Sequence, residues 1–291
     1  MQNLDDKTFQ MNIIEFRNLF REVLRLKFKV NEIDFIYKKL LYSFFRLEST
    51  VIGLNPKMDL TFFQEKKMKI ALSSIQKDTP LQYVTGKAPF LDFELFVNSS
   101  VLIPRPETEE LVRWVLESCE NGQNIFDLCT GSGCIALGLK KNNSTLKITG
   151  IDISQKAILI GIKNSKKLNL EVNWLVKDLK NIELEDSFID IIVSNPPYIY
   201  PEEKKIMHSR VLDYEPHIAL FTPIDDPVCY YKYCINFAKK SLRVGGKLFF
   251  EINPNYINDI KNLLISSNFS SLETRKDIFG KNRMLSAKKN G

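Results

Sequence analysis

The residues with the clearest chemical character are Asn195-Pro196-Pro197-Tyr198, which directly follow the buried-strand pattern Ile191-Ile192-Val193-Ser194. Proline has no backbone N–H and fixes its own φ, so the segment presents carbonyl oxygens in a rigid array. Asn195 adds a side-chain carbonyl, and Tyr198 adds a flat aromatic face. Acceptors beside a π surface suit a planar amide or amine, whose N–H groups donate to Asn195 Oδ1 and the Pro196 carbonyl. We predict that all four residues bind such a substrate group and that Asn195, Pro196 and Tyr198 are catalytic.

This arrangement favours transfer of a methyl group from a sulfonium cofactor to the bound nitrogen. An amide nitrogen is a poor nucleophile because its lone pair is delocalised. The site must therefore lower the barrier by orientation and polarisation more than by a strong base. Its position also fits a ligand site, because open α/β sheets bind ligands at the carboxyl ends of their strands. The alternative interpretation is a rigid Pro-Pro loop with a packed tyrosine.

A glycine-rich segment, Cys129-Thr130-Gly131-Ser132-Gly133, follows an earlier apolar stretch that ends at Leu128. Glycine lets the backbone turn sharply and approach a ligand without a Cβ in the way. Asp152 lies 19 residues after Gly133, where an acidic side chain accepts hydrogen bonds from ribose hydroxyls. With Ala136 the pattern also fits the G-x-G-x-x-A dinucleotide form, so these residues alone leave NAD and S-adenosylmethionine open. A purely structural tight turn is the third interpretation.

Alternating strands and helices must position these segments. The strands that we predict are 125–128, 147–152, 171–176, 189–194 and 247–252, with a last pair around 272–274 and 284–287. Helices near 133–141, 154–168, 227–242 and 255–266 separate them. Strands that alternate with helices form a parallel sheet that is covered on both faces.

The region before residue 90 has helical periodicity instead. Apolar residues recur at helical spacing up to about residue 80, including the set Phe62, Phe63, Met68, Ile70, Ala71 and Ile75, and predict a helical-bundle core. Pro80 should end the last helix. The runs 90–97 and 101–103 flank the polar Asn98-Ser99-Ser100 and predict a β-hairpin. A helix should open near Pro106, with Thr108 or nearby acids favourable at its N-terminal end.

Composition and charge exclude several classes of protein. The 291 residues are 44% hydrophobic and 26% charged, which is typical of a globular chain and not of a disordered or fibrous one. The net charge of +6 comes without a polybasic arm, so we expect no stable nucleic-acid partner. The five cysteines and two histidines have no zinc-like spacing, which argues against a metal. We expect free thiols, no signal peptide, no membrane span and a cytoplasmic location.

The chain resembles the HemK/PrmC family of protein-(glutamine-N5) methyltransferases over nearly its whole length. The resemblance rests on motifs that include Asn195-Pro196-Pro197-Tyr198, which adenine methyltransferases acting on DNA share. The Ile103-Pro104-Arg105-Pro106-Glu107-Thr108-Glu109 segment is more specific to this family. Further matches are the segments 80–86, 127–133, Tyr214-Glu215-Pro216 and the closing Lys276-Asp277-Ile278-Phe279-Gly280-Lys281-Asn282-Arg283.

The resemblance implies an α/β fold: a class I S-adenosylmethionine-dependent methyltransferase domain, Rossmann-like, with a mostly parallel seven-stranded sheet. A helical substrate-recognition domain would span 1–85, a β-hairpin linker 86–104 and the methyltransferase domain 105–291. The substrate would be the glutamine of the Gly-Gly-Gln motif in peptide-chain release factors, methylated to N5-methylglutamine by a monomeric enzyme.

The resemblance also assigns site residues by position. Cys129, Thr130, Gly131, Ser132 and Gly133 would line the methionine part of S-adenosylmethionine, and Asp152 would hold its ribose. Asp178 and Leu179 would flank the adenine, while Asn195 would touch both cofactor and substrate. Glu215 would bind the substrate loop or orient a neighbouring backbone, and a structural helix-capping role is the alternative. After residue 220 the family often has a glycine-rich turn, which this chain replaces with Phe221-Thr222-Pro223-Ile224-Asp225-Asp226-Pro227.

Three other functions remain open from sequence. An adenine or guanine amino methyltransferase would use the same chemistry, because Tyr198 stacks on a flipped base as readily as on an amide. An NAD-dependent oxidoreductase would leave the 195–198 segment without a role. A non-catalytic adaptor that binds release factors would have no need of Gly131, Gly133, Asp152 and Asn195.

Overall fold

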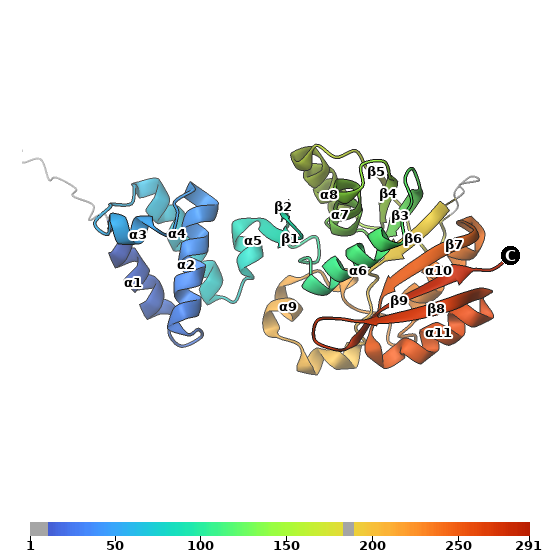
Figure 1. The fold of residues 1–291 in the computed structure, drawn as a ribbon. Helices are drawn as coiled ribbons and strands as arrows, with labels where there is room; N and C mark the ends of the chain where they lie inside the picture. The colour runs from blue at the N-terminus through green and yellow to red at the C-terminus, as the bar shows by residue number, and fades with distance from the viewer. Residues whose placement is uncertain (1–10, 183–188) are drawn as a thin grey trace, which may run out of the picture. The chain divides into compact units, whose positions relative to one another are not determined.

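The computed structural model describes residues 11–182 and 189–291, and the chain divides into two compact units after Gly86 (Figure 1). The helices of the first unit are α1 (Ile13–Leu24), α2 (Val30–Phe45), α3 (Val51–Leu54), α4 (Phe62–Gln76) and α5 (Leu81–Thr85). Asn12 caps α1, because its side chain accepts from the N–H groups of Ile14 and Glu15. The Glu15 carboxylate in turn accepts from the N–H of Asn12.

The core of the first unit is apolar and includes Phe16, Phe20 and Tyr37. The Tyr37 hydroxyl is satisfied by donating to the Ile13 carbonyl at 2.7 Å. One sequence prediction is wrong here and one is confirmed. Phe62, Phe63 and Ile70 are not core residues, since 67%, 68% and 61% of their surfaces are exposed. The helix of the third apolar set ends before Pro80 as predicted, because α4 stops at Gln76, and Pro80 is the N-cap of the short helix α5 that follows.

The hairpin at the start of the second unit also differs from prediction. β1 (Lys87–Phe90) pairs antiparallel with β2 (Phe93–Phe96) through a turn at Leu91-Asp92. Leu91 has a φ of 51°, and its N–H donates to Glu109 Oε1 at 2.9 Å. Residues 101–103, which the structure describes, form no strand. The turn was missed because it contains none of the glycine or asparagine that marks a two-residue hairpin loop.

Within the described residues the second unit contains a seven-stranded sheet in the order β5-β4-β3-β6-β7-β9-β8. The five strands β5, β4, β3, β6 and β7 are parallel to one another, whereas β9 is antiparallel to both β7 and β8. Their bounds are β3 (Asn124–Leu128), β4 (Lys147–Asp152), β5 (Asn173–Val176), β6 (Ile189–Ser194), β7 (Leu242–Glu251), β8 (Phe269–Lys276) and β9 (Asn282–Lys289). The mostly parallel α/β sheet confirms the predicted fold class.

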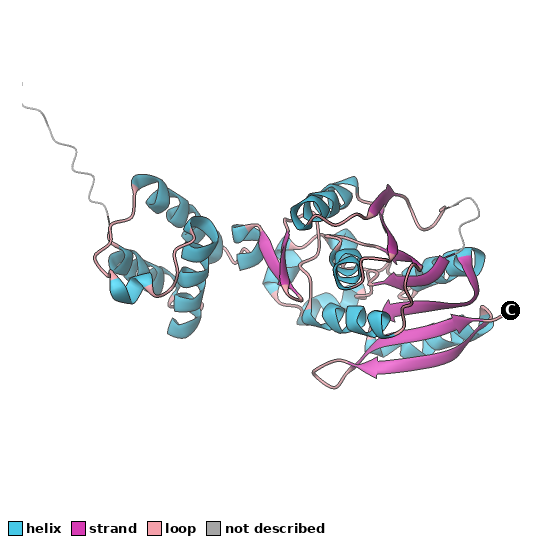
Figure 2. Ribbon diagram, turned by 45° about the horizontal axis from the view of Figure 1, so that its top comes forward, coloured by secondary structure: helices cyan, strands magenta, loops and turns pink. Residues whose placement is uncertain are grey.

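Helices cover both faces of this sheet, as the cyan ribbons beside the magenta strands show (Figure 2). Ile191 and Val193 of β6 pack in the cluster that contains α6 and α7, whereas Ile192 packs in the cluster that contains α10 and α11. Alternate residues of a strand point to opposite faces, so a central strand must be apolar on both. The helices are α6 (Pro106–Glu117), α7 (Cys134–Asn142), α8 (Gln155–Leu168), α9 (Ser209–Tyr214), α10 (Cys229–Ser241) and α11 (Ile257–Ser266).

Several strand ends differ from the predicted ones. β5 begins at Asn173 instead of 171, and β7 begins at Leu242 instead of 247. β8 and β9 are longer than the predicted pair because each extends through exposed polar residues that interrupt the apolar pattern. No described helix is long and apolar enough to cross a membrane. All five cysteines lie in the described part of the chain and are free thiols.

Trp174 of β5 lies against glycines from three separate elements. A Cβ added at Gly133, Gly150 or Gly161 would come within 2.6, 2.6 or 2.8 Å of its indole ring. Real Cβ atoms do not approach other atoms so closely, so a side chain at any of these positions must displace the ring. Gly133 is therefore required by packing, in addition to its φ of 81° at the N-cap of α7.

We predict that Gly161→Ala destabilises the protein by about 1–3 kcal/mol because the added methyl group overpacks this site. Alanine would otherwise be favoured in helix α8 by roughly 1 kcal/mol. Gly53→Ala is the matched control, since Gly53 is also helical but an added Cβ there meets nothing within 4 Å. Urea unfolding measures both variants. A Gly161→Ala variant as stable as the wild type would contradict the packing argument.

Candidate active site

The glycine-rich loop after β3 contains three residues in the left-handed region: Cys129, Gly131 and Gly133, with φ of 59°, 55° and 81°. The Thr130 N–H donates to the Ile151 carbonyl of β4, and the Gly133 N–H donates to the Thr130 carbonyl, both at 2.9 Å. The left-handed conformation costs a non-glycine residue such as Cys129 roughly 1–2 kcal/mol. Strained backbone of this kind is concentrated at functional sites.

Asp127 lies beneath this loop and is fully buried. Its Oδ2 accepts from the Thr130 hydroxyl at 2.5 Å and from the Ala136 N–H at 3.1 Å. Its Oδ1 has no hydrogen-bond partner within the described residues. Burial raises the pKa of Asp127 to about 7, against the opposing effect of its two hydrogen bonds. The carboxyl ties the loop to the start of α7, a role that sequence reasoning did not assign to it.

Asp152, at the end of β4, holds the same loop from its outer side. Its two oxygens accept from the N–H groups of Gly131 and Ser154, each at 2.9 Å. Burial raises the pKa of Asp152, although both backbone hydrogen bonds act to lower it. The half-buried carboxylate keeps lone pairs for a further ligand, because each oxygen accepts more than one hydrogen bond.

A cavity of about 300 Å³ opens between these segments. An added Cβ at Gly131 would meet nothing within 4 Å, so this glycine leaves the wall of the cavity open. Gly133, by contrast, is not among the lining residues and packs against Trp174, so its contact with the cofactor stays a prediction. The other residues predicted to bind the cofactor all line this cavity: Cys129, Thr130, Gly131, Ser132, Asp152, Asp178, Leu179 and Asn195.

Asn195 lines this cavity and also a second, smaller one of about 70 Å³. Pro196 and Tyr198 line the smaller cavity, and Pro197 lines the larger one. Both prolines are buried, while Asn195 and Tyr198 are half-buried. The structure thus brings the predicted substrate residues to the junction of two cavities, with Asn195 shared between them.

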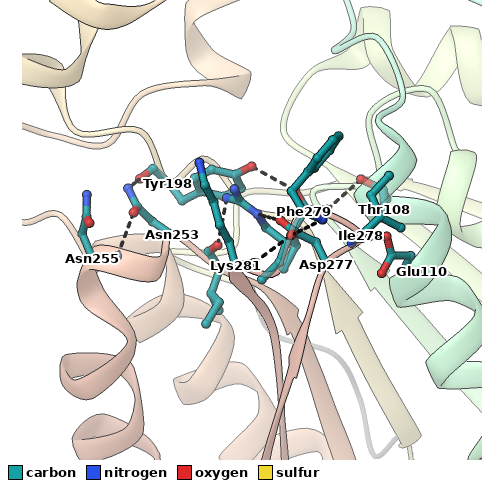
Figure 3. A network of polar contacts seen from close by, with 12 residues as sticks. Thr108, Glu110, Tyr198, Asn253, Asn255, Asp277, Ile278, Phe279 and Lys281 are labelled. Atoms are coloured by element: carbon teal, nitrogen blue, oxygen red, sulfur yellow. Dashed lines mark hydrogen bonds and ion pairs between the residues drawn. The ribbon is translucent and has the colours of Figure 1, made fainter.

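A buried polar network includes Thr108 and Tyr198 (Figure 3). Asn195 Nδ2 donates to the Thr108 hydroxyl at 3.2 Å, and Thr108 donates to Glu251 Oε2 at 2.7 Å. The Tyr198 hydroxyl donates to the other oxygen, Glu251 Oε1, at 2.9 Å. Thr108 therefore links α6 to β7. Of the residues predicted to be favourable at the N-terminal end of α6, the acids Glu107 and Glu109 lie in its first turn. Burial raises the pKa of Glu251, and the hydrogen bonds from Thr108 and Tyr198 act to lower it.

Sequence reasoning missed Glu251 entirely. The available signal was an acid directly after the apolar run Leu248-Phe249-Phe250, at the carboxyl end of a central strand. A charged residue at the end of a buried strand, with 1% of its surface exposed, needs partners that satisfy it.

The β8–β9 turn supports the segment that follows Glu251. Asp277 Oδ1 accepts from the N–H groups of Phe279 and Lys281, each at 2.9 Å, and Oδ2 pairs with Arg283 at 3.3 Å (Figure 3). Arg283 in turn donates to the Ile252 carbonyl at 3.3 Å. Burial alone would raise the pKa of Asp277, but these partners outweigh it and lower the pKa.

Glu215 does not line either cavity and is 4% exposed. One carboxylate oxygen accepts from the Ile103 N–H at 3.0 Å, and the other pairs with Arg105 at 2.5 Å. These contacts are those of a residue that orients neighbouring backbone, whereas direct binding of the substrate loop by Glu215 stays a prediction. Arg105 itself lines the smaller cavity, so Glu215 positions part of its wall.

The atypical segment after residue 220 is held against the residue that follows Tyr198. Ile199 forms a parallel bridge with Phe221 and donates to the Leu220 carbonyl at 2.9 Å. Pro223 then reaches the wall of the larger cavity.

Comparison with known proteins identifies the family. The model of the methyltransferase small domain matches residues 107–213. The chain is 35% identical over 280 residues to the release factor glutamine methyltransferase of Flavobacterium psychrophilum, covering 94% of this chain and 98% of the relative. It is 38% identical to the protein of the same name from Bacteroides thetaiotaomicron, covering 78% of this chain and 82% of the relative. The chain belongs to the release factor glutamine methyltransferase family.

A solved structure agrees on the fold of this family member. The methyltransferase from Pyrococcus furiosus superposes with a TM-score of 0.50 at 18% identity, covering 68% of this chain and 89% of that one. Membership confirms the resemblance stated from the motifs. It also excludes the oxidoreductase that the glycine pattern alone left open, because the protein is a methyltransferase.

We predict that Asp127→Asn flattens the pH dependence of the free energy of unfolding. The folded pKa of Asp127, about 7, lies above the ordinary aspartate pKa of 3.8. The folded state therefore binds a proton that the unfolded state releases, and this stabilisation is lost as pH rises from about 4 to about 7. Asparagine does not titrate, so wild type should lose stability relative to the variant over this range.

Urea unfolding of both proteins at intervals from pH 5 to 8 measures the difference. Asp213→Asn, at an exposed acid, is the control and should retain the wild-type slope. Parallel pH profiles for wild type and Asp127→Asn would contradict the assignment.

Proposed function

We propose that this enzyme transfers a methyl group from S-adenosyl-L-methionine to the side-chain amide nitrogen of the glutamine in the Gly-Gly-Gln motif of release factors. The products are N5-methylglutamine and S-adenosylhomocysteine. The observation that carries the proposal is that Asn195 forms part of the wall of two cavities. One cavity accommodates the methyl donor and the other the amide that receives the methyl group. The family name supports the choice of substrate.

The larger cavity has the groups that S-adenosylmethionine requires. Asp152 presents carboxylate oxygens for ribose hydroxyls, and Asp178 presents another acid near the adenine position. Ile153 and Leu179 supply apolar surface for the adenine ring. Gly131 leaves space for the methionine part, because no side chain fills that wall. When bound, the cofactor supplies an electrophilic methyl group on a sulfonium sulfur.

The smaller cavity is the proposed site of the substrate carboxamide, because Asn195, Pro196 and Tyr198 all line it. Asn195 Oδ1 and the Pro196 carbonyl accept the two amide N–H groups, and Tyr198 bounds the cavity on one side. The relatives named release factor glutamine methyltransferase make the amino methyltransferase of nucleic acids the weaker candidate.

The site residues act by orientation. Asn195 is neutral, and the nearest acid of its network, Glu251, is occupied by the Thr108 and Tyr198 hydroxyls. Such a site holds the amide in line for methyl transfer and stabilises the charge that develops on it. The proton that the nitrogen loses passes to solvent.

We predict that Asn195→Ala and Asp152→Ala impair different steps. Asn195→Ala should lower methyl transfer to a purified release factor by about 10²–10³, with most S-adenosylhomocysteine affinity retained, because it removes an electrostatic contact to the substrate. Asp152→Ala should weaken S-adenosylhomocysteine by about 1.5–3 kcal/mol, the range for hydrogen bonds to charged groups.

Labelled S-adenosylmethionine and calorimetric titration measure the two quantities. A release factor whose loop glutamine is replaced is the substrate control and should receive no label. Near-normal turnover by Asn195→Ala, or label on the control, would refute the assignment.

The helical unit is the proposed site of release factor recognition. A glutamine side chain offers little surface by which one protein is distinguished from another, so selectivity requires a second contact. Helix α4 exposes Phe62, Phe63 and Ile70, and Phe62, Lys66 and Ile70 lie along a surface groove. Exposed aromatic residues with a basic rim are typical of protein-binding surfaces.

We predict that the double variant Phe62→Ser, Phe63→Ser lowers kcat/KM for intact release factor by about tenfold or more, the cost of a hot spot. The kcat/KM for a short Gly-Gly-Gln peptide should not change, because a peptide does not reach α4. Leu26→Ser is the control, since Leu26 is 92% exposed in the same unit but lies outside α4. Equal losses on protein and peptide would show that α4 has no docking role.

A further inference from the structure

The hydrogen bonds behind Asn195 have a defined direction. Glu251 receives the Thr108 hydroxyl on Oε2 and the Tyr198 hydroxyl on Oε1, at 2.7 and 2.9 Å. Each oxygen of Glu251 is thus the acceptor of one hydroxyl, and both hydroxyls are donors. The backbone at Glu251 is also fixed, because its carbonyl accepts from the buried Tyr231 hydroxyl at 3.1 Å. Glu251 is thus a rigidly held acceptor of two hydrogen bonds.

This direction determines how Thr108 can meet Asn195. A threonine hydroxyl has one proton and two lone pairs. Since the proton of Thr108 is committed to Glu251, only its lone pairs face Asn195. The group that fits against these lone pairs is the Nδ2 amide NH₂ of Asn195, which lies 3.2 Å from Thr108 Oγ1. Oδ1 is then the atom of the Asn195 amide that remains for a ligand.

The opposite amide orientation would defeat the proposed chemistry. Oδ1 would face the lone pairs of Thr108, and Nδ2 would face the N–H groups of the substrate amide. Both pairings place like groups together, so neither forms a hydrogen bond. An asparagine amide is nearly symmetric in shape, and packing alone does not distinguish its two orientations.

We propose that Thr108 and Glu251 are positioning residues, which fix the Asn195 amide with Oδ1 toward the substrate nitrogen. This inference rests on the proposed function, because it concerns the group that Asn195 presents to glutamine. Both residues are well placed for the role, since Thr108 is 2% and Glu251 is 1% exposed. Thr108 lies in the first turn of α6 after Pro106, and Glu251 ends β7, so two rigid elements hold the pair.

The test compares Thr108→Val, which keeps the shape but removes the hydroxyl, with Thr108→Ser, which keeps the hydroxyl. Thr108→Val should lower kcat for release factor methylation by about 10- to 100-fold, because a misplaced reacting group costs up to about that much. Thr108→Ser should restore most of the rate. Thr108→Val should also lower the melting temperature, because Glu251 Oε2 loses its donor, so the rates are compared well below the melting temperature of each variant. Thr108→Ser should keep the wild-type melting temperature, and S-adenosylhomocysteine should still bind both variants. Thr149→Val is the matched control, a buried threonine of β4 outside both cavities.

Glu251→Gln is the second variant. Glutamine has the same shape, but its amine can donate to Thr108 and so release the direction of the hydrogen bonds. We expect a loss of kcat comparable to that of Thr108→Val. A purely structural link between α6 and β7 would survive this substitution, because glutamine still bonds to both hydroxyls. Turnover within about twofold of wild type in Thr108→Val and Glu251→Gln would overturn the proposal.

A readout without substrate separates this inference from the proposed function. In ¹⁵N-labelled protein the Asn195 side-chain amine should show a nuclear Overhauser effect to the Thr108 methyl group, lost or weakened in Glu251→Gln. If the effect is present but wild type does not methylate a release factor, the proposed function fails and the positioning role stands. If the release factor is methylated and the effect is absent, the positioning role fails.

Discussion

The parallel register of four strands places the site residues at one edge of the sheet. Leu128 of β3 pairs with Ile151 of β4 and with Ser194 of β6, and Ser194 pairs with Phe250 of β7. The next residue along each strand is Cys129, Asp152, Asn195 or Glu251. A shift of one residue in any pairing would exchange the side chains that pack in the two cores on opposite faces of the sheet, so close packing in both cores enforces this alignment. The loop strain, the cavities and the polar network all depend on it.

The three acids near this edge hold the structure around the ligand sites. Asp127 and Glu251 are buried, and Asp152 reaches the larger cavity. Asp127 ties the loop to α7, Asp152 ties it to β4, and Glu251 ties α6 to the 195–198 segment. A buried carboxylate is costly unless hydrogen bonds satisfy it, and here those bonds come from the elements that must not move. Preorganisation is thereby built into the acids themselves.

The sequence was sufficient for the fold and for the positions of most site residues. Apolar strands alternating with helices predict the parallel sheet, and each apolar run that ends in a polar motif predicts a residue at its carboxyl edge. Long-range pairings were not predictable. Nothing near Thr108 in the sequence indicates that Glu251 lies opposite it, and nothing near Gly133 indicates Trp174. The hairpin turn at Leu91 was not predicted for a related reason, because its conformation depends on Glu109 from a later helix.

The arrangement also explains why a neutral side chain serves at the centre of the site. A carboxylate in place of Asn195 would accept the same N–H groups, but it would carry a charge beside Glu251 in a low-dielectric environment. Like charges at such a separation force one acid to take up a proton, which would then face either Thr108 or the substrate. An amide has a fixed donor and a fixed acceptor, and Glu251 can orient them without changing their protonation. The Glu251 carboxyl contacts Asn195 only through Thr108 and does not contact the ligand. It can therefore fix the orientation of the Asn195 amide without competing for the proton of the substrate nitrogen.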